Sequence, residues 1–599
     1  MLDFIKNTFS SVLGTLIALF FLGFMAFLSL ILIAQALHDP EPQIPEKALL
    51  VVDLSLSIND KPPTASIDQV IEEAILASHM ERVGLRNLLN SIEFAKNDER
   101  IKGIFLHGNL QSVNFGSGYA AIREVRAALE GFKKSGKPIY AYILNAMPRD
   151  YYLMSVADKV AMNPFGEVFF NGLGIEMMFY ANALEKWGIG VQPVRAGKFK
   201  SGIEPFVQDH MSEEHRLQVT EMIQKLWDSM AEAVSESKEI PIGQLNAAAN
   251  RDRSFRAEQA LETGLVDELV YFDEVLGHLK EITGDDPDER TVTQVDLGDY
   301  MKANREKGSS RSENKVAVVY VEGIIVGGEG QYDQAGAKKI ARRLRDVRLD
   351  DSVKAVVLRV NSPGGSAQAS EIIQREVRLL RGSKPVVASM GYVAASGGYW
   401  VSTYADRIFA QPNTITGSIG VFGIIFNVQE IAQDFGLNWD YATTHDFAGS
   451  WTITRPQTEG EMAQLRDTTE WYYARFLQKV AESRDLEIEY LDSVAQGRIW
   501  MGHEALKVGL IDEIGGLEDA ISEAVEMAGL ESDYRVVDFP RAHQLEEVIQ
   551  ALLEDRELDV SFDPARRISR RVEIELEWLK AFDDPRGIYL LPDIQFQLF

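Results

Sequence analysis

The sequence contains two copies of one pattern, and this duplication limits what the chain can fold into more than any other feature. Four short segments recur in the same order, displaced by 252, 247, 248 and 245 residues. The matched segments are 102–109 with 354–361, 137–138 with 384–385, 157–164 with 405–412, and 264–268 with 509–513. Each copy spans about 240 residues, which is too long for a solenoid repeat and long enough for a domain. The sequence therefore predicts two tandem domains of the same fold.

Within each copy, short apolar runs alternate with longer amphipathic stretches. In the second copy the runs VAVVYVEG, KAVVLRV and PVVASM are interleaved with ASEIIQREVRLLRG and TTEWYYARFLQKVAES. Runs rich in β-branched residues, separated by segments of helical period, indicate βαβ units around a mainly parallel, buried sheet. We therefore expect an α/β fold in each copy.

Changes in composition suggest where the domains begin and end. The polar stretch 308–314 has no hydrophobic pattern, and we expect it to link a first repeat, 46–307, to a second repeat, 315–540. Residues 541–599 are predicted to form a charged tail with helical pieces near Gln544–Leu553 and Arg570–Phe582. We assign no chemistry to this tail.

The first forty residues predict a membrane anchor. No charged side chain occurs between Lys6 and His38, and about 20 apolar residues are enough for a helix to cross the hydrocarbon core. We expect residues 1–45 to hold an uncleaved transmembrane helix. A cleaved signal peptide is the alternative, since Ala34-Gln35-Ala36 resembles a cleavage site, but the run exceeds the usual signal core of about 7–15 residues. Lys6 before the helix predicts a cytoplasmic N-terminus, with the body on the far side.

Charge and composition exclude several classes of partner. The formal net charge is −29 and no basic patch stands out, which argues against nucleic acid and anionic membrane surfaces as partners. The chain has no cysteine, so disulfides, thiolate metal sites and a cysteine nucleophile are excluded. We expect no cofactor and no metal.

The two copies differ where one of them carries candidate chemistry. The second copy places Ser396 between small residues in MGYVAASGGYW, and the matching position of the first copy, 248 residues earlier, is Pro148. The first copy carries Lys200 in KFKSGIEPF, and the matching position of the second copy is Ala448. This complementary loss predicts one composite site that both repeats build.

A serine and a lysine can form such a site. A serine hydroxyl is a weak nucleophile that needs a base beside it. Lysine can be that base if burial lowers its pKa from about 10.4 toward neutrality. Two alternatives stay open on spacing alone: Lys200 is a solvated surface lysine, or Lys198, which would point the same way on a strand, is the base instead.

A glycine-rich turn supplies a further part of the site. Asn361-Ser362-Pro363-Gly364-Gly365-Ser366 follows an expected strand and precedes an expected helix, where backbone N–H groups can face a developing oxyanion. The first copy has no glycine pair there. A Ser/His/Asp triad through His445-Asp446 is the alternative, but adjacent residues on a strand point in opposite directions.

Four motifs resemble the long, duplicated form of the signal peptide peptidase A (protease IV) family. These motifs are MGYVAASGGYW, NSPGGS, TGSIGV and KSGIEPF. The resemblance implies two tandem repeats of the Clp protease/crotonase-like fold, with Ser396 as nucleophile and Lys200, rather than Lys198, as general base. It further implies that Ser418 orients the base. The oxyanion-hole donors implied by the resemblance are Gly365, Gly364 and Gly397.

The same resemblance implies a membrane-bound serine endopeptidase that degrades cleaved signal peptides and other unfolded apolar segments. It implies a homotetramer on the periplasmic side of a bacterial inner membrane, with no nucleic acid, metal or nucleotide involved. Two rivals are weighed against it: a crotonase-type acyl-CoA enzyme, which shares the fold, and a non-enzymatic, membrane-tethered peptide-binding scaffold. The predicted anchor and Ser396 both count against the acyl-CoA enzyme.

Overall fold

The computed structural model describes residues 42–62, 81–112, 116–304, 312–331, 333–539, 588–590 and 597–598. Most of the predicted anchor (residues 1–41), most of the predicted linker and the two predicted helical pieces of the tail lie outside these residues. Among the helices that the structure does describe, none combines the length and apolar character needed to cross a membrane.

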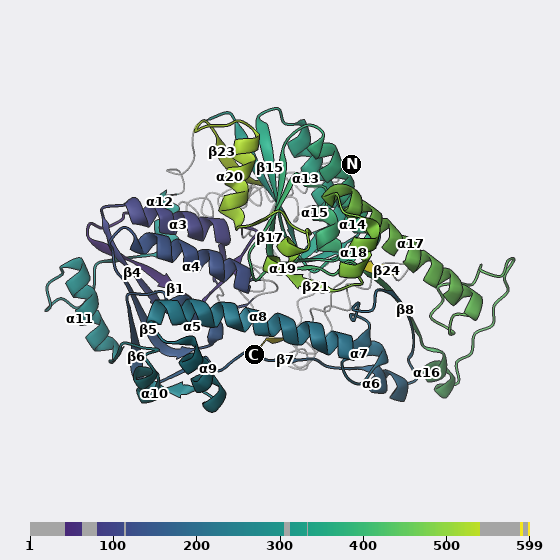
Figure 1. The fold of residues 1–599 in the computed structure, drawn as a ribbon, viewed down its shortest axis with the longest axis horizontal. Helices are drawn as coiled ribbons and strands as arrows, with labels where there is room; N and C mark the ends of the chain where they lie inside the picture. The colour runs from purple at the N-terminus through teal and green to yellow at the C-terminus, as the bar shows by residue number, and fades with distance from the viewer. Residues whose placement is uncertain are drawn as a thin grey trace, which may run out of the picture.

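Each predicted repeat contains one large, mainly parallel sheet, so the expected α/β fold is confirmed (Figure 1). The first sheet has the order β10-β6-β5-β4-β1-β11, with β9 antiparallel on β6. Its strands are β1 (Ala48–Asp53), β4 (Ile101–His107), β5 (Ile139–Ala146), β6 (Lys159–Val168), β9 (Phe255–Arg256), β10 (Glu268–Leu269) and β11 (Gln294–Asp296). The central strands are buried along almost their whole length, as the continuous apolar runs predict.

The second sheet repeats this order. Its path is β21-β19-β17-β15-β12-β23, with β18 and β22 branching from β17. Its strands are β12 (Lys315–Glu322), β15 (Val353–Ser362), β17 (Val386–Ala395), β18 (Arg407–Ala410), β19 (Ile415–Gly417), β21 (Ile499–Met501), β22 (Glu513–Ile514) and β23 (Arg535–Phe539). The series β11-β1-β4-β5-β6-β10 thus corresponds to β23-β12-β15-β17-β18-β22. The domain boundaries predicted from composition stay predictions.

The helices follow the same duplication. The first repeat has α3 (Leu85–Asn97), α4 (Tyr119–Lys133), α5 (Pro148–Met154), α6 (Ala181–Lys186), α7 (Glu204–Val207), α8 (Glu213–Lys238), α9 (Ile242–Arg251), α10 (Ala257–Thr263), α11 (Phe272–Thr283) and α12 (Leu297–Asn304). The second has α13 (Ala337–Leu349), α14 (Ala367–Arg381), α15 (Gly397–Ser402), α16 (Gln429–Asp434), α17 (Glu459–Arg484), α18 (Ile488–Val494), α19 (Gly502–Lys507) and α20 (Leu517–Met527). The longest pair, α8 and α17, each begin at a hydroxyl N-cap: Ser212 accepts from the N–H of His215, and Thr458 from that of Glu461.

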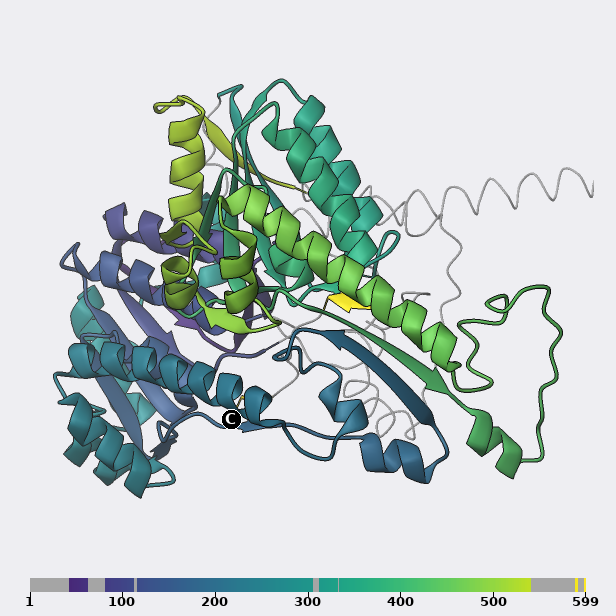
Figure 2. The same cartoon turned by 45° about the vertical axis from the view of Figure 1, so that its right-hand side comes forward.

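A third sheet joins the two repeats, with the order β14-β13-β16-β24-β20-β8. Its strands are β8 (Gly190–Ala196), β13 (Ile324–Val326), β14 (Gln334–Gly336), β16 (Gly365–Ser366), β20 (Val421–Asn427) and β24 (Ile588–Leu590). Strand β8 comes from the first repeat and pairs antiparallel with β20 of the second, from Ala196 opposite Val421 to Gly190 opposite Asn427. Figure 2 shows blue β8 beside green β20.

The short strand β24 lies between two strands of the second repeat. It pairs antiparallel with β16, where Leu590 is opposite Gly365, and with β20, where Tyr589 is opposite Phe422. The described residues also contain two two-stranded sheets, which pair β2 (Leu56–Asn59) with β3 (Glu81–Gly84) and β7 (Ile175–Glu176) with β25 (Gln597–Leu598). Part of the tail thus belongs to the sheet that joins the repeats.

A buried charge cluster also holds the repeats together. The guanidinium of Arg359 on β15 is fully buried and lies 2.6 Å from Asp60 and 2.8 Å from Glu124, both in the first repeat. Its Nη1 donates to the hydroxyl of Ser389 at 2.8 Å. The second oxygen of Glu124 accepts from the N–H of Leu517 at 2.7 Å. Since each charged group has partners, removal of one of them leaves the others buried without compensation.

We expect Arg359→Leu to destabilise the protein by about 3–5 kcal/mol, because two buried carboxylates lose their cation. The matched control is Arg381→Leu, which removes the ion pair of Arg381 with Asp406 in the same repeat, where the Arg381 side chain is 42% exposed. That control should cost about 0–1 kcal/mol. Urea titration of both variants measures the difference, and equal shifts of the midpoint would contradict a special role for Arg359.

Candidate active site

Ser396 lies at the junction of β17 and α15, at the position that caps the helix. Its backbone has φ 54° and ψ −112°, which is unusual for a residue other than glycine, and conformations of this kind cost about 1–3 kcal/mol. The N–H of Ser396 donates to the carbonyl of Gly417 at 2.8 Å. The small neighbours predicted to keep bulk away have a packing reason, since a Cβ on Gly397 would lie 2.6 Å from Ser370 Oγ.

Lys200 reaches this serine from the other repeat. The chain leaves β8 at Ala196, turns at Gly197 and brings Lys200 fully inside the protein. Lys200 Nζ lies 2.7 Å from Ser396 Oγ, 2.9 Å from Ser418 Oγ and 3.0 Å from the carbonyl oxygen of Ser418, all within hydrogen-bond distance. The three side chains predicted to form the site therefore meet, and all three are buried.

The two lysines lie in different environments. Residues 197–200 form a turn, not a strand, so Lys198 and Lys200 do not point the same way. Lys198 is exposed, with its ammonium over the ring of Phe199. The alternative in which Lys200 is a surface lysine is wrong, because its side chain has no exposed area.

The predicted oxyanion turn lies against the residue after Ser396. Gly364 and Gly365 have φ values of 102° and 153°, and a Cβ on Gly365 would lie 2.0 Å from the carbonyl oxygen of Ile325. A Cβ on Gly397 would lie 3.0 Å from Gly364 Cα and 3.1 Å from the nitrogen of Gly365. Only glycines allow this approach, and it brings all three predicted oxyanion-hole residues beside Ser396.

Two facing glycines let the loops of the two repeats meet. Gly197 (φ 109°) and Gly497 (φ 78°) lie where the 197–200 turn passes the 496–499 segment. A Cβ on Gly497 would lie 2.7 Å from Lys200 Cβ, and one on Gly197 would lie 2.6 Å from the carbonyl carbon of Gln496. The N–H of Phe199 donates to the carbonyl of Gln496 at 2.9 Å. The position of Lys200 therefore depends on backbone contact with the second repeat.

In the first repeat, the turn that corresponds to the Ser396 turn is filled by a carboxylate side chain. Pro148 is the first residue of α5, so Met147 is the cap that corresponds to Ser396, one residue earlier than the sequence offset indicates. Neither residue carries a hydroxyl. Asp150 fills this turn: its carboxylate accepts from the N–H of Leu110 at 2.8 Å and of Met147 at 2.9 Å. Burial raises the pKa of Asp150.

The triad alternative does not fit the structure. His445 lies exposed in the segment after α16, where its Nδ1 is 3.0 Å from Thr444 Oγ1, whereas Ser396 is fully buried. Ala448, the position matched to Lys200, lies exposed in the same segment. The second repeat thus has no lysine counterpart at the serine. Among the described residues, no group of three or more His, Asp or Glu side chains is placed to hold a metal ion.

The sequence reasoning missed a buried polar cluster beside the base turn. Glu204 accepts from Ser212 Oγ at 2.6 Å and lies 3.0 Å from His215 Nδ1, with both Glu204 and His215 fully buried. Burial by itself would raise the pKa of Glu204, but the hydrogen bonds from His215 and Ser212 outweigh it and lower the pKa. The cluster fixes α7 against the start of α8. Only the N-cap pattern of Ser212 signalled it in the sequence.

A buried serine that contacts an amine and glycine backbone groups is the arrangement used by serine hydrolases. The fold and the site together define this class of protein. The sequence profile of peptidase family S49 matches residues 131–284 and again residues 378–531, a displacement of 247 residues at both ends. The chain therefore belongs to peptidase family S49, it is a serine protease, and the predicted duplication is confirmed.

Curated relatives agree with this assignment. The chain is 34% identical to "Protease 4" of Salmonella typhi, with 91% of this chain and 90% of that protein covered. It is 31% identical to "Protease 4" of Haemophilus influenzae, with 95% of each covered. It is 30% identical to "Serine protease SPPA, chloroplastic" of Arabidopsis thaliana, with 79% of this chain and 70% of that protein covered.

We expect Gly497→Ala to reduce peptidase activity by about 10–100-fold, because the added Cβ displaces Lys200 and small misplacements of catalytic groups are costly. Gly509→Ala is the matched control: Gly509 has φ 77°, so it carries the same backbone strain of about 1–2 kcal/mol, but its nearest neighbour is Leu486 Cδ2 at 3.4 Å. Turnover and melting temperature are measured for both. Equal activities in the two variants would show that the contact with Lys200 does not matter.

Proposed function

We propose that the chain is a membrane-anchored serine endopeptidase in which Ser396 is the nucleophile and Lys200 is the general base. The observation that carries this proposal is the 2.7 Å contact between Lys200 Nζ and Ser396 Oγ, made across the repeat boundary and inside the protein. The complementary absences at Met147-Pro148 and Ala448 support it, because neither repeat has both groups.

The geometry supports a definite division of roles. A neutral amine has two N–H groups and one lone pair; with both N–H groups donated to the two oxygens of Ser418, the lone pair faces the hydroxyl of Ser396. Ser418 is thus an orienting residue for the base. The fully buried position of Lys200 favours this neutral form, because removal from water disfavours an ammonium ion.

The reaction then follows from these positions. Ser396 Oγ attacks the scissile carbonyl carbon while its proton passes to Lys200 Nζ. The N–H groups of Gly365 and Gly397 are the candidate donors to the oxyanion of the tetrahedral intermediate, whereas the N–H of Gly364 donates to Ser362 Oγ at 3.1 Å. The ammonium of Lys200 returns the proton to the leaving nitrogen as the C–N bond breaks. Water, deprotonated by Lys200, then hydrolyses the acyl-enzyme, and the proton goes back to Ser396.

We infer that a peptide substrate binds as an extended strand between β16 and β20. The tail strand β24 occupies this position, opposite Gly365 and Phe422, so the slot accepts an extended chain by main-chain pairing. One relative, 30% identical over 236 residues, is named "Putative signal peptide peptidase SppA" of Enterococcus faecium. Cleaved signal peptides and other unfolded apolar segments are the proposed substrates.

We expect Ser396→Ala to abolish peptide cleavage and Lys200→Ala to reduce it by about 10²–10⁴-fold, since Lys200 removes the proton of the nucleophile. The double variant should be little worse than Ser396→Ala, because the two groups act as one unit. Lys198→Ala is the matched control, an exposed lysine two residues away, and should keep activity within about twofold. Near-normal turnover of Lys200→Ala would contradict the proposed base.

The dependence on pH adds a second readout of the same proposal. Since only the neutral amine accepts a proton, kcat/KM should rise with pH through a midpoint well below the ordinary lysine value of about 10.4. A lysine that is buried as the neutral amine binds fewer protons in the folded state than in the unfolded state. It therefore lowers the free energy of unfolding as pH falls below about 10.4. Lys200→Met should therefore be inactive yet at least as stable as the parent near neutral pH; a flat rate profile from about pH 6 to 10 would argue against the neutral base.

We further propose that residues 1–45 anchor the chain in a bacterial inner membrane, with the body periplasmic, and that four copies assemble, each repeat having a Clp protease/crotonase-type fold. The repeated strand order supports the fold type. The segment after α16 carries exposed apolar side chains that a neighbouring copy would cover, namely Phe435, Leu437, Trp439, Tyr441, Phe447, Trp451 and Ile453.

The full-length chain should resist carbonate extraction from membranes and have the mass of four chains in detergent. A mature N-terminus at Leu37 would show a cleaved signal peptide instead of an anchor, and a monomeric mass would contradict the tetramer.

Phe435→Ser with Trp439→Ser should weaken assembly if the exposed segment is a subunit contact. Ile514→Ser, which changes an exposed apolar residue on β22, is the control.

A further inference from the structure

The position of Lys200 must be fixed by contacts, because the 197–200 turn belongs to no helix or strand. Within the turn, the N–H of Lys200 donates to the carbonyl of Gly197 at 3.2 Å. On one side of the turn, the N–H of Phe199 donates to the carbonyl of Gln496. The carbonyl of Phe199, directly before Lys200, accepts from the side chain of Gln218 at 3.1 Å.

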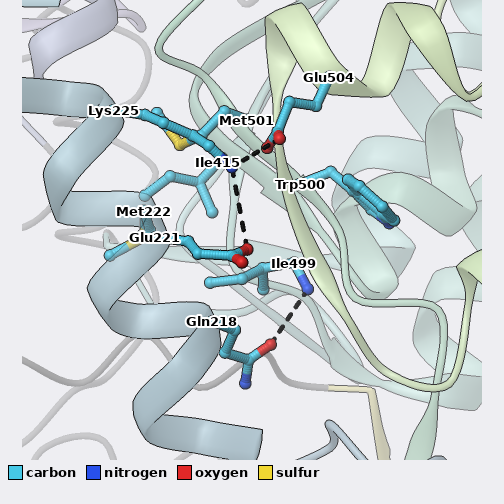
Figure 3. A pocket seen from close by; sticks show the side chains of 9 residues that line it. All are labelled: Gln218, Glu221, Met222, Lys225, Ile415, Ile499, Trp500, Met501 and Glu504. Atoms are coloured by element: carbon cyan, nitrogen blue, oxygen red, sulfur yellow. Dashed lines mark hydrogen bonds and ion pairs between the residues drawn. The ribbon is translucent and has the colours of Figure 1, made fainter. Parts of the chain in front are cut away.

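Gln218 uses both ends of its side chain, and the two ends contact different repeats. It lies in the second turn of α8, buried at 2% exposure. Its Nε2 donates to the carbonyl of Phe199 in the first repeat, and its Oε1 accepts from the N–H of Ile499 on β21 in the second, at 3.3 Å. Figure 3 shows this contact to Ile499 beside the salt bridges of Lys225.

The segment contacted by Gln218 leads to the other two residues of the site. Ile499 is opposite Gly417 in the pairing of β21 with β19. The carbonyl of Gly417 accepts from the N–H of Ser396, and the N–H of Ser418 donates to the carbonyl of Arg498 at 2.7 Å. One carboxamide therefore connects the backbone before Lys200 to the backbone that carries Ser418 and Ser396.

We propose that Gln218 is a positioning residue for the reaction: its carboxamide holds the Lys200 turn against β21, and so fixes the distance between base and nucleophile across the repeat boundary. This inference rests on the proposed function of Lys200. A carboxamide is required because one neighbour is an acceptor and the other a donor. Glutamate keeps only the acceptor, and methionine, of similar length, keeps neither.

Other contacts of α8 provide a control for the interface itself. Lys225, two turns further along the helix, forms salt bridges with Glu504 of the second repeat at 2.5 Å and with Glu221 at 3.9 Å. Its side chain is 38% exposed and lies in the same small cavity as Gln218 (Figure 3). Lys225→Met thus loosens the same contact between repeats at a distance from the base turn.

The test compares Gln218→Met, Gln218→Glu and Lys225→Met in the full-length protein. The concentration of folded enzyme is taken from the absorbance of the gel-filtered protein, and kcat and KM are then measured per folded chain from pH 6 to 10. We expect Gln218→Met to lower kcat about 10–100-fold with KM within about twofold, because the base is misplaced rather than substrate lost. The midpoint of its rate profile should move to higher pH, because a looser base is better hydrated.

Gln218→Glu should fall between the parent and Gln218→Met, and Lys225→Met should keep kcat within about twofold. If Gln218→Met does not fold, the loss of kcat at unchanged KM in Gln218→Glu still tests the inference. Normal kcat per folded chain in the Gln218 variants, or an equal loss in Lys225→Met, would overturn it. Lys200→Ala is measured alongside: if that variant is active, the proposed function fails, whereas an inactive Lys200→Ala with a normal Gln218→Met refutes this inference alone.

Discussion

The antiparallel pairing of β8 with β20 is the constraint on which the active site depends. A strand of the first repeat is held by main-chain hydrogen bonds to a strand of the second, over seven residues on each side. The strand β8 ends at Ala196, four residues before Lys200, and β20 begins three residues after Ser418. A shift of register by one residue would turn every side chain to the opposite face of the sheet, and Lys200 would no longer meet Ser396.

Each buried polar group requires a hydrogen-bond or ion-pair partner. At several points in this protein the partner of a buried side chain belongs to the other repeat. Lys200, Arg359 and Gln218 each extend from one repeat to oxygen atoms or N–H groups of the other. A buried group that loses its partner costs more than the contact itself contributes. These contacts therefore specify one relative placement of the repeats, whereas apolar packing alone tolerates small displacements.

The active-site residues that lie in short local motifs could be predicted from the sequence. Ser396 was predicted from its small neighbours together with the proline at the matching position of the first copy, and the Gly364-Gly365 turn from its place between an expected strand and an expected helix. The roles of these residues came from the family resemblance. Spacing could not separate Lys198 from Lys200, because strand alternation does not hold in the turn that the chain forms there. The offset of 248, taken from Ala157 and Ala405, placed the counterpart of Ser396 at Pro148 instead of Met147, because the intervening helix α5 has seven residues and α15 has six.

The pairing of β8 with β20 and the role inferred for Gln218 had no local signal. The register of two strands so far apart in sequence is set by the whole fold, and a glutamine in an amphipathic helix resembles any solvated residue until its neighbours are known. The short strand β24 is a similar case, because a three-residue strand in a charged tail has no recognisable pattern.

The pairing of β8 with β20 also sets the time at which the enzyme can become active during its own synthesis. Gly190–Ala196 leaves the ribosome more than 220 residues before Val421–Asn427. At about 5–20 residues per second, this interval lasts roughly 10–45 seconds. Throughout this interval Lys200 has been made and Ser396 has not, so a nascent chain carries only one residue of the proposed catalytic pair.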